Sequence, residues 1–560
     1  MSLDLLFPNF DELIRTPEDV QRLNETILQL AVQGKLVPQD PNDEPASELL
    51  KRIAGEKRRL VQEKKIRKSK QLPPIKPPEV PWDLPRGWCW SRLGDVILEI
   101  QTGPFGSMLH KSDYVEGGVP VVNPANIRDG RIVLLANMAV SEDTVKRLER
   151  YVLEQGDIVM GRRGEMGRCA VVTESEAGWL CGSGSFNLKT SHNMAQEYLV
   201  RLIRSPDARS YLSGGSVGST MNNLNHRILN RMVIGVPPVA EQQRIVAKVD
   251  ELFAQTRALE AKLRQAQERV VTFNRAALHR MHTAQDDAQF QTSWRTVSDH
   301  FDVLYDDPRN VAELRQAILD LAVRGKLAPQ DPNDEPAEEL LKNIGGGKRT
   351  ENGRKKSLKS TLVSVRSDTL YDVPSSWAWA QFFEVANIAT NSTDPGLYPD
   401  LPHIAPNNIE KFTGRLLAYR TVAEDGVSSV NHHFFAGQLL YSKIRPNLSK
   451  AVLIDFEGFC SADMYPIESL IDARYLHLYV LSSTFLSMVT RNDTRVAMPK
   501  VNQKALSKVP VAVPPLAEQQ RIVAKVDQLM RLCDALEAGL AQTEASRSTL
   551  TQAVLHQITS

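Results

Sequence analysis

Two long stretches of the chain carry apolar residues at alternating intervals of four and three positions. The first stripe runs through Ile245, Val249, Leu252, Thr256, Leu259, Leu263, Ala266, Val270, Phe273 and Ala277. The second runs through Ile522, Val526, Leu529, Cys533, Leu536 and Leu540, is lost at Thr543 and Arg547, and returns at Leu550 and Val554. This spacing is that of the coiled-coil heptad, so it predicts two long helices with one apolar seam each.

Each seam needs an apolar partner. Because the two helices are related copies, the simplest hypothesis is that they pack on one another. The alternatives are that each packs on its adjoining globular domain or on a second chain.

A shorter apolar stripe lies ahead of each long helix. In the first copy Thr16-Pro17-Glu18-Asp19 is a helix start, because it offers a capping hydroxyl, a proline and an acid in the first turn. The stripe that follows consists of Val20, Leu23, Ile27 and Leu30, and Gly34 ends it. In the second copy, which begins at Asp307-Pro308, the stripe consists of Val311, Leu314, Ile318 and Leu321, and Gly325 ends it.

The helical segments are an internal repeat. Residues 23–59 and 314–350 are identical at 26 of 37 positions, and residues 236–263 and 513–540 at 20 of 28. The two intervening regions, about 88–235 and about 377–512, align only loosely. One architecture is therefore written twice in the chain, with different contents between the repeated parts.

The intervening regions contain short β-type runs bounded by Gly, Pro and Asn, such as residues 118–122, 156–160 and 437–441. The predicted fold class is α+β, with two pseudo-symmetric halves that each hold an α+β domain followed by a long coiled-coil-forming helix. The predicted boundaries are 1–85 for the first helical repeat and linker, 86–237 for the first domain, 238–282 for the first long helix, 283–370 for a linker and the second repeat, 371–513 for the second domain and 514–560 for the second long helix.

The linker predicted before the first domain, Lys51 to Pro85, is strongly basic at its start. Residues 51–70 contain ten basic and two acidic residues, and a proline-rich run follows. Such a charge run is typical of a solvated or disordered segment.

Composition narrows the classes of function. The 68 basic and 67 acidic residues give a net charge of +1, which excludes a general polycation but allows a local basic face. The five cysteines form no CxxC pair and no cluster with histidine, so we expect neither disulfides nor zinc. Without an apolar run of membrane length or a basic leader, the sequence predicts a cytoplasmic protein with no membrane partner.

Motifs of catalysis are missing from the sequence. Gly345-Gly346-Gly347-Lys348 has neither the spacing nor the hydroxyl of a phosphate-binding loop. Gly182-Ser183-Gly184 is an isolated motif, and Pro237-Pro238 lacks the polar and aromatic neighbours that an amino-methyltransferase uses. We therefore expect a chain that is not itself an enzyme.

Three segments, AVQGKLVPQDPNDEPASELL, PPVAEQQRIVAKVD and GDIVMGRRGEMGRCAVV, resemble the specificity subunit of type I restriction-modification enzymes. The resemblance covers nearly the whole chain and is to members with a long N-terminal repeat ahead of the first target recognition domain. It implies two domains that each read half of a bipartite DNA sequence, and repeated helices that space them and dock two methyltransferase subunits, with motor and endonuclease subunits joining that core.

The resemblance also implies that this chain binds no cofactor, and that S-adenosylmethionine, ATP and Mg²⁺ belong to the partner subunits. The alternative hypothesis is a coiled-coil scaffold that holds two protein-binding domains apart without touching DNA.

Arg, Lys, Asn and Gln make the bidentate contacts that read bases in the major groove, and other cations hold phosphates. The first domain offers Lys111, Arg128, Arg131, Arg162, Arg163, Arg168, Asn222, Asn223, Asn225 and Arg227. The second offers Asn407, Asn408, Lys411, Arg415, Lys443, Arg445, Asn447, Lys450, Arg495, Lys500, Asn502, Gln503 and Lys504. Any one of them is equally explained as an exposed charge or a turn cap, so the clusters are more informative than their members.

Other conspicuous residues have simpler interpretations. Trp88 and Trp377 begin the two domains at matching places, which favours a role in the core over base stacking. Cys533 lies in the predicted seam, where a buried thiol is expected. His432-His433 is typical of a polar turn rather than of a metal site.

Overall fold

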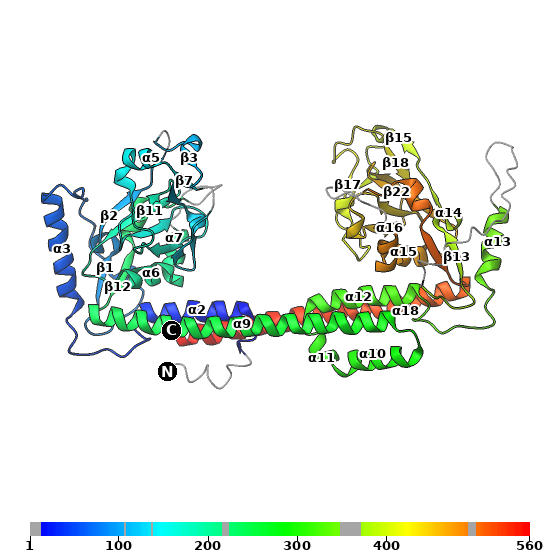
Figure 1. Ribbon diagram of the computed structural model, residues 1–560, viewed down its shortest axis with the longest axis horizontal. Helices are drawn as coiled ribbons and strands as arrows, with labels where there is room; N and C mark the ends of the chain where they lie inside the picture. Colours follow the sequence, from blue (N-terminus) through cyan, green and yellow to red (C-terminus); the bar gives the residue numbers. More distant parts are fainter. Residues whose placement is uncertain are drawn as a thin grey trace. The chain divides into compact units, whose positions relative to one another are not determined.

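The computed structural model describes residues 13–105, 108–135, 138–214, 223–347, 371–490 and 500–559. The chain divides into two compact units (Figure 1). Unit 1 comprises Met1–Ala266 and Ala545–Ser560, and unit 2 comprises Gln267–Glu544. Two long helices, α9 (Val239–Thr283) and α18 (Leu516–Thr559), each contribute one part to each unit.

The short repeated helices are α2 (Pro17–Val32) and α12 (Pro308–Val323). The Thr16 and Asp307 side chains cap them, as the sequence predicts. Gly34 and Gly325 follow their ends with φ of +70°, a left-handed conformation that glycine adopts at little cost. Their predicted apolar stripes are buried, apart from the partly buried Leu314.

The two long helices share one buried core in each unit. In unit 1 the core combines α2, the first part of α9 and the last part of α18, which contributes Leu555 and Ile558. In unit 2 it combines α12, the last part of α9, which contributes Leu278 and Met281, and the first part of α18, where Cys533 is buried. Each core thus holds parts of both long helices. The short helix contacts both of them, since in unit 2 Glu313 of α12 pairs with Arg275 of α9 at 2.7 Å and Arg315 of α12 pairs with Asp534 of α18 at 2.6 Å.

Near the end of each long helix the predicted seam is wrong at some positions, although Ala277 is buried and Val270 and Val554 are partly buried against the cores. Phe273 and Leu550 are 42% and 58% exposed, and Ala266 is exposed too. The buried stripe there lies one residue later and consists of Val271, Asn274, Leu278 and Met281 in α9 and Thr551, Leu555 and Ile558 in α18. A helix with 3.6 residues per turn drifts from a strict seven-residue repeat, so one seam cannot face the same side throughout.

Each unit contains one α+β domain built on a four-stranded antiparallel sheet. In the first domain the strand order is β2 (Ile97–Thr102), β11 (Ser185–Thr190), β8 (Ile158–Gly161) and β9 (Cys169–Val171). In the second it is β14 (Ala386–Ile388), β22 (Met464–Ser469), β19 (Leu439–Ser442) and β20 (Ala451–Leu453). The orders match strand for strand, although the two sequences align only loosely.

Each domain contains a second sheet. In the first it contains β10 (Leu180–Cys181), β4 (Val119–Val122), β7 (Ala139–Val140) and β3 (Tyr114–Val115). In the second it contains β15 (Ser392–Thr393), β18 (Asn431–Phe434), β21 (Gly458–Cys460), β16 (Pro402–Ile404) and β17 (Arg420–Thr421). Both contain a parallel pair, β10 with β4 and β21 with β16.

The strands at the two ends of each domain pair with one another. Antiparallel pairs join β1 (Cys89–Arg92) to β12 (Val233–Val236), and β13 (Ala378–Gln381) to β23 (Pro510–Val513). Trp88 and Trp377, just before the first strand of each pair, are buried as predicted. Each domain is therefore inserted into the helical frame at a single place.

Short helices complete the domains. The first has α4 (Leu93–Val96), α6 (Gln196–Arg204), α7 (Pro206–Gly214) and α8 (His226–Arg231). The second has α14 (Phe382–Val385), α15 (Ala473–Leu481), α16 (Ser483–Thr490) and α17 (Gln503–Ser507). Unit 2 also holds α10 (Asp287–Asp299) and α11 (Phe301–Leu304) after α9.

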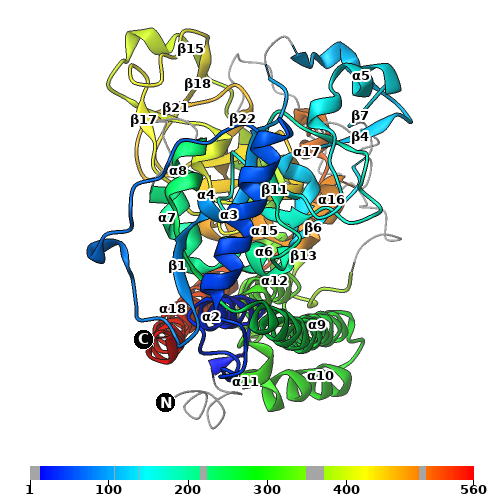
Figure 2. The same ribbon diagram turned by 90° about the vertical axis from the view of Figure 1, so that its left-hand side faces the viewer.

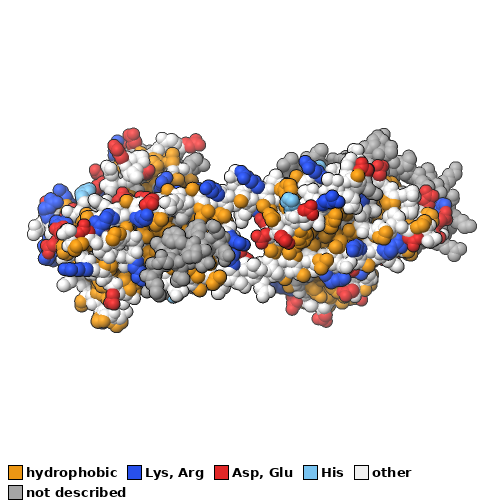
Figure 3. All heavy atoms as spheres, turned by 90° about the horizontal axis from the view of Figure 1, so that it is seen from below, with side chains coloured by type: hydrophobic (Ala, Val, Ile, Leu, Met, Phe, Trp, Pro, Cys, Tyr) orange, Lys and Arg blue, Asp and Glu red, His pale blue; other side chains and the backbone are white. Residues whose placement is uncertain are grey.

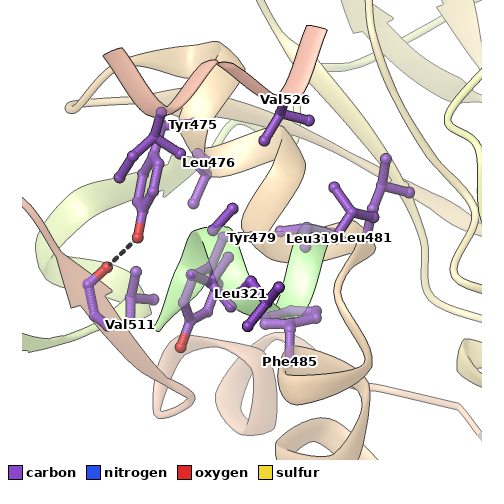
Figure 4. Close-up of a cluster of buried hydrophobic side chains, with 14 of the residues drawn as sticks. Leu319, Leu321, Tyr475, Leu476, Tyr479, Leu481, Phe485, Val511 and Val526 are labelled. Atoms are coloured by element: carbon purple, nitrogen blue, oxygen red, sulfur yellow. Dashed lines mark hydrogen bonds between the residues drawn. The ribbon is translucent and has the colours of Figure 1, made fainter. Parts of the chain in front are cut away.

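The core of unit 2 joins its domain to its helices. Figure 4 shows Leu319 and Leu321 of α12 beside Tyr479 of α15 and Phe485 of α16. The hydroxyl of Tyr475, which is fully buried, donates to the carbonyl of Ala512 at 2.8 Å. The domain and the helical frame are thus packed as one body within this unit.

We expect Tyr475→Ala to lower the free energy of unfolding by about 3–5 kcal/mol, because it leaves a cavity in this core. Tyr475→Phe keeps the ring and loses one hydrogen bond, for about 1 kcal/mol. Urea unfolding followed by tryptophan fluorescence measures both, with Tyr419→Phe at an exposed tyrosine as the control. Equal losses for the two Tyr475 variants would contradict the assignment.

The repeated segments hold one another together. In unit 1 the Glu241 carboxylate accepts hydrogen bonds from Trp88 Nε1 at 2.9 Å and from Gln39 Nε2 at 3.1 Å. Burial raises the pKa of Glu241, and these two bonds oppose that shift. Nearby, Arg244 pairs with Asp43 at 2.6 Å.

Unit 2 contains the same set of contacts between the PQDPNDEP turn and the first turns of the long helix, and we call this set the clasp. Gln330 donates to Glu518 at 2.6 Å, and Arg521 pairs with Asp334 at 2.5 Å. The PQDPNDEP turns, predicted only as turn chemistry, therefore bind the first turns of the long helices. Their contact explains why the two segments are repeated together.

The helix α3 (Ala46–Gln62) follows the first clasp, and its counterpart α13 (Ala337–Gly347) follows the second. Figure 2 shows α3 alongside α4 of the first domain. The predicted linker from Lys51 is therefore helical over residues 51–62, although most of these residues are exposed or half-buried, as expected of a charge run. Leu49 and Ile53 of α3 are buried in the core of unit 1, and this apolar face explains why the charged segment is a helix.

Candidate nucleic-acid interface

The cationic cluster of the first domain is built around Arg162, directly after β8. Its guanidinium lies over the ring of Phe186 on the neighbouring strand β11, with Cζ 5.0 Å from the ring centroid. The carbonyl of Arg162 accepts a hydrogen bond from the backbone N–H of Leu224 at 3.0 Å. The loop after β8 is thereby joined to the residues that lead into α8.

Four further predicted residues lie at this junction. The Asn225 side chain caps α8 by accepting from the backbone N–H groups of Arg227 at 2.9 Å and Ile228 at 3.1 Å. Arg163 Nε donates to Asn223 Oδ1 at 3.3 Å. Arg163 and Arg227 are exposed, so two separate stretches of sequence form one polar, cationic surface.

The second domain repeats the arrangement. Lys443 directly follows β19, and its Nζ lies 5.2 Å from the ring centroid of Tyr465 on β22. Its carbonyl accepts from the backbone N–H of Val501 at 2.8 Å. The Asn502 side chain caps α17 by accepting from Ala505 N at 2.8 Å. In both domains a cation over an aromatic ring is tied to an asparagine-capped helix start.

The two loops differ in their exposed residues and in their backbone. Gly164 and Gly167 have φ near +80° in the first loop. In the second loop Arg445 and Ser449 adopt φ of +48° and +42° without being glycines. Such backbone is costly for most residues and persists where the surroundings impose it. The same framework therefore presents a different set of side chains in each domain.

Positive charges crowd together at these junctions. Burial lowers the pKa of Arg162, and Arg163 lowers it further. Burial also lowers the pKa of His226, with Arg162 as a second cause. In the second domain burial, followed by Arg445, lowers the pKa of Lys450. Burial is the main cause of each pKa shift, and a neighbouring cation adds to it; a bound anion would relieve that second contribution.

Some of the predicted residues make hydrogen bonds within the fold. Arg168 donates to the carbonyl of Pro124 at 3.2 Å, and Lys450 donates to the carbonyl of Pro406 at 2.6 Å. The Asn408 amide accepts from the backbone N–H of Ala405 at 2.8 Å and donates to a carbonyl at 2.8 Å. The simpler interpretation, a turn cap, fits Asn408.

The remaining predicted residues of the second domain lie near its loop or on α17. The backbone N–H of Phe412 donates to the carbonyl of Leu448 at 3.2 Å, which brings the turn with Lys411 and Arg415 beside residues 443–450. Arg415 is paired with Glu410 at 2.7 Å. The others are exposed and are Asn407, Asn447, Lys500, Gln503 and Lys504.

Three predicted residues of the first domain lie on other elements. Arg128 and Arg131 face each other across the hairpin of β5 (Ile127–Arg128) and β6 (Arg131–Ile132). Lys111 lies in the short turn Lys111–Asp113. Asn222 and Arg495 lie outside the described residues.

Phe186 and Tyr465 are absent from the sequence prediction. Each lies on a strand next to its cation, and the pairing with Met160 and Tyr441 across the sheet sets its place. Only the register of β11 with β8 and of β22 with β19 reveals them.

The described residues contain no group of three metal-ligating side chains. His432 and His433, predicted as a polar turn, lie instead in strand β18. His433 Nε2 donates to Glu457 Oε1 at 2.8 Å, and its ring stacks on Phe459. No helix among the described parts of the chain has the length and apolar character to cross a membrane.

Comparison with known proteins gives the same family for both domains. The family model of the type I restriction modification DNA specificity domain matches residues 85–269 and 376–543. The chain is 32% identical to the specificity subunit of the type I restriction enzyme EcoDI of Escherichia coli, over 68% of this chain and 77% of that protein.

Another relative is matched over nearly its whole length. The chain is 28% identical to the Escherichia coli EcoAI specificity subunit, over 92% of this chain and 90% of that protein. Among solved structures, the HsdS subunit from Thermoanaerobacter tengcongensis superposes with a TM-score of 0.37 at 20% identity, over 85% of this chain and 98% of that one.

Proposed function

The chain belongs to the type I restriction-modification DNA specificity family, and from that premise we propose which of its residues contact DNA. It is a non-catalytic subunit with two DNA specificity domains. In our proposal each domain reads one half of a bipartite sequence. The first domain uses the loop after β8 and the start of α8, and the second uses the loop after β19 and the start of α17. These surfaces are residues 162–168 with 223–227, and residues 443–450 with 500–504.

One observation supports this proposal above the others. Both domains tie a cation over an aromatic ring to an asparagine-capped helix start, yet the exposed side chains around this framework differ. The shared cation suits a phosphate, which is the same at every site. The Arg, Asn and Gln residues that differ between the domains suit base edges, which differ from one DNA sequence to another.

We further propose that the chain assembles with two methyltransferase subunits and, through them, with motor and endonuclease subunits. The clasp of Glu241 with Trp88 and Gln39 has a counterpart in unit 2, so the helical frame offers two similar surfaces. Two identical partners would fit two such surfaces. S-adenosylmethionine, ATP and Mg²⁺ would then be bound by those partners.

Arg162→Ala tests the first interface. We expect DNA affinity to fall by about 1–3 kcal/mol, roughly 5- to 150-fold, because a desolvated cation that meets DNA is lost. Lys443→Ala should have an effect of the same kind at the other half of the target. Fluorescence anisotropy with DNA that contains the sequence methylated by the complete enzyme measures both.

Arg264→Ala is the matched control, because Arg264 lies on an exposed face of α9, where it pairs with Glu260 at 2.8 Å. Equal affinities of Arg162→Ala, Arg264→Ala and the unaltered chain would contradict the proposed surface. DNA binding that is absent or unaffected by salt would favour the coiled-coil scaffold, because phosphate contacts weaken as salt rises.

A further inference from the structure

A basic cleft lies outside the surface proposed above, where the end of α3 and the chain after it meet the first domain. Its volume is about 780 Å³. Seven Lys and Arg residues and a single carboxylate residue, Glu99, line it. The seven cationic residues are Lys57, Arg67, Lys68, Lys70, Arg150, Arg227 and Arg231. We call residues 63–72 the basic strap.

Within the cleft, positive charge is largely uncompensated. Glu99 already accepts from Gln101 at 2.7 Å and lies 3.6 Å from Arg150. Among the described residues, no carboxylate lies within 4.0 Å of the cationic groups of five lining residues, namely Arg67, Lys68, Lys70, Arg227 and Arg231. A cleft with this balance attracts anions.

Elsewhere on the same segment the cations are paired. Lys51 pairs with Glu48 at 2.7 Å, and Glu63 lies 3.2 Å from Arg59 and 2.9 Å from Lys65. On the face of the molecule in Figure 3, acidic and basic side chains are interspersed over both units. The cleft therefore differs from an ordinary charged surface in its lack of acids.

The strap is fixed at both ends. Before it, Lys57 Nζ donates to the carbonyls of Gly94 at 2.7 Å and Ile97 at 2.8 Å. After it, the buried Arg92 donates to the carbonyl of Pro73 at 2.7 Å and pairs with Glu79 at 3.0 Å. The arginine and lysines between these anchors are thus held at the cleft with less conformational entropy to lose on binding.

The strap also fits closely against the domain. A Cβ added to Gly94 would lie 2.9 Å from Leu72 Cδ1 and 2.3 Å from Asn230 Oδ1. Since those distances are shorter than side chains tolerate, Gly94 leaves the space in which Leu72 rests on α4. A disordered tail would need no such fit.

We propose that the basic strap binds phosphates of the DNA duplex next to the half-site of the first domain. This inference rests on the proposed function, because Arg227 belongs both to the cleft and to the surface proposed to read DNA. That shared residue favours DNA over an acidic protein surface as the occupant. The strap precedes residue 85, where the match to the family's recognition domain begins, so its contacts would add affinity without sequence preference.

The test replaces Arg67, Lys68 and Lys70 together by alanine in the full-length chain. A control replaces Lys51, Arg52 and Arg59 of α3, which removes the same charge from paired positions outside the strap and the cleft. Affinity for target and mixed-sequence DNA is measured against salt for each protein, alone and assembled with methyltransferase subunits. Sedimentation measures that assembly, and circular dichroism checks that both variants fold.

Three lost phosphate contacts should reduce the slope of log affinity against log salt by about 2.7. Between 50 and 200 mM salt, the unaltered chain should therefore lose about 40-fold more affinity than the strap variant. The loss should be equal for target and mixed-sequence DNA, and the methylated sequence should stay the same. Trimming the duplex beside the first half-site should weaken the unaltered chain and leave the strap variant unchanged.

An unchanged salt slope in the strap variant, with salt-dependent binding by the unaltered chain, would overturn the inference and leave the proposed function intact. An unchanged salt slope together with weaker assembly with methyltransferase subunits would also overturn the inference, because the strap would then bind an acidic protein surface. Binding by the unaltered chain that ignores salt and sequence would instead overturn the proposed function. Should the triple alanine variant unfold, the glutamine triple at the same positions carries the same test.

Discussion

A chimera in which residues 88–235 come from a relative is expected to methylate a sequence that is new in its first half and unchanged in its second. Both ends of this segment lie at one place, since β1 and β12 pair from Cys89 with Val236 to Arg92 with Val233. The exchange therefore disturbs the helical frame little. Because each mismatched base pair costs about 1–3 kcal/mol, three altered pairs would move the preference by about 3–9 kcal/mol.

Sequencing of DNA methylated by the complete enzyme measures the result. The donor must retain the tryptophan at position 88, because its indole donates to Glu241. The reciprocal exchange of residues 377–512 is the control and should change only the second half. If either exchange changed both halves together, the division of reading between two independent domains would be wrong.

Local signals predicted the helical frame well. Thr16 and Asp307 cap the helices that the sequence places after them, and Gly34 and Gly325 end them. The buried Cys533 follows from its heptad position. Such features depend on residues a few positions apart, which a single sequence contains in full.

Features that depend on distant partners were predicted poorly. The buried stripe of α9 moves from Phe273 to Asn274 as the helix drifts from the seven-residue repeat, and the heptad does not reveal where the buried side changes. The partners of Glu241 are Gln39, in the PQDPNDEP turn, and Trp88, just before β1, and both are distant from it in sequence. Local periodicity cannot encode such pairings, because they are set by the tertiary fold.

The candidate interface was predicted in part for the same reason. Residues near Arg162 and near Asn225 were both singled out, but their junction depends on the hydrogen bond between Arg162 and Leu224. The aromatic rings under the two cations follow from strand register. A single sequence distinguishes a cation in such a junction from any exposed arginine only by the cluster around it.

We expect four residues inserted in both long helices, after Gln267 and after Glu544, to move the two recognised half-sequences apart by one or two base pairs. The insertion adds about 6 Å of helix at 1.5 Å per residue, and B-DNA rises about 3.4 Å per base pair along a strand. Each unit contains one part of α9 and one of α18 on its own side of these points. Its internal packing is therefore kept, and the half-sequences themselves should not change.

Matched insertions separate length from register. Four residues turn the helix somewhat past a full revolution, so some loss of stability is expected, whereas seven residues keep the heptad and should add about three base pairs. An insertion in α9 alone makes the shared frame unequal and should impair assembly instead. Methylation mapping and sedimentation distinguish these results. A doubly lengthened chain that assembles and methylates with unaltered spacing would show that the helices do not set the separation, and the segment from Thr283 to Tyr305 would be tested next.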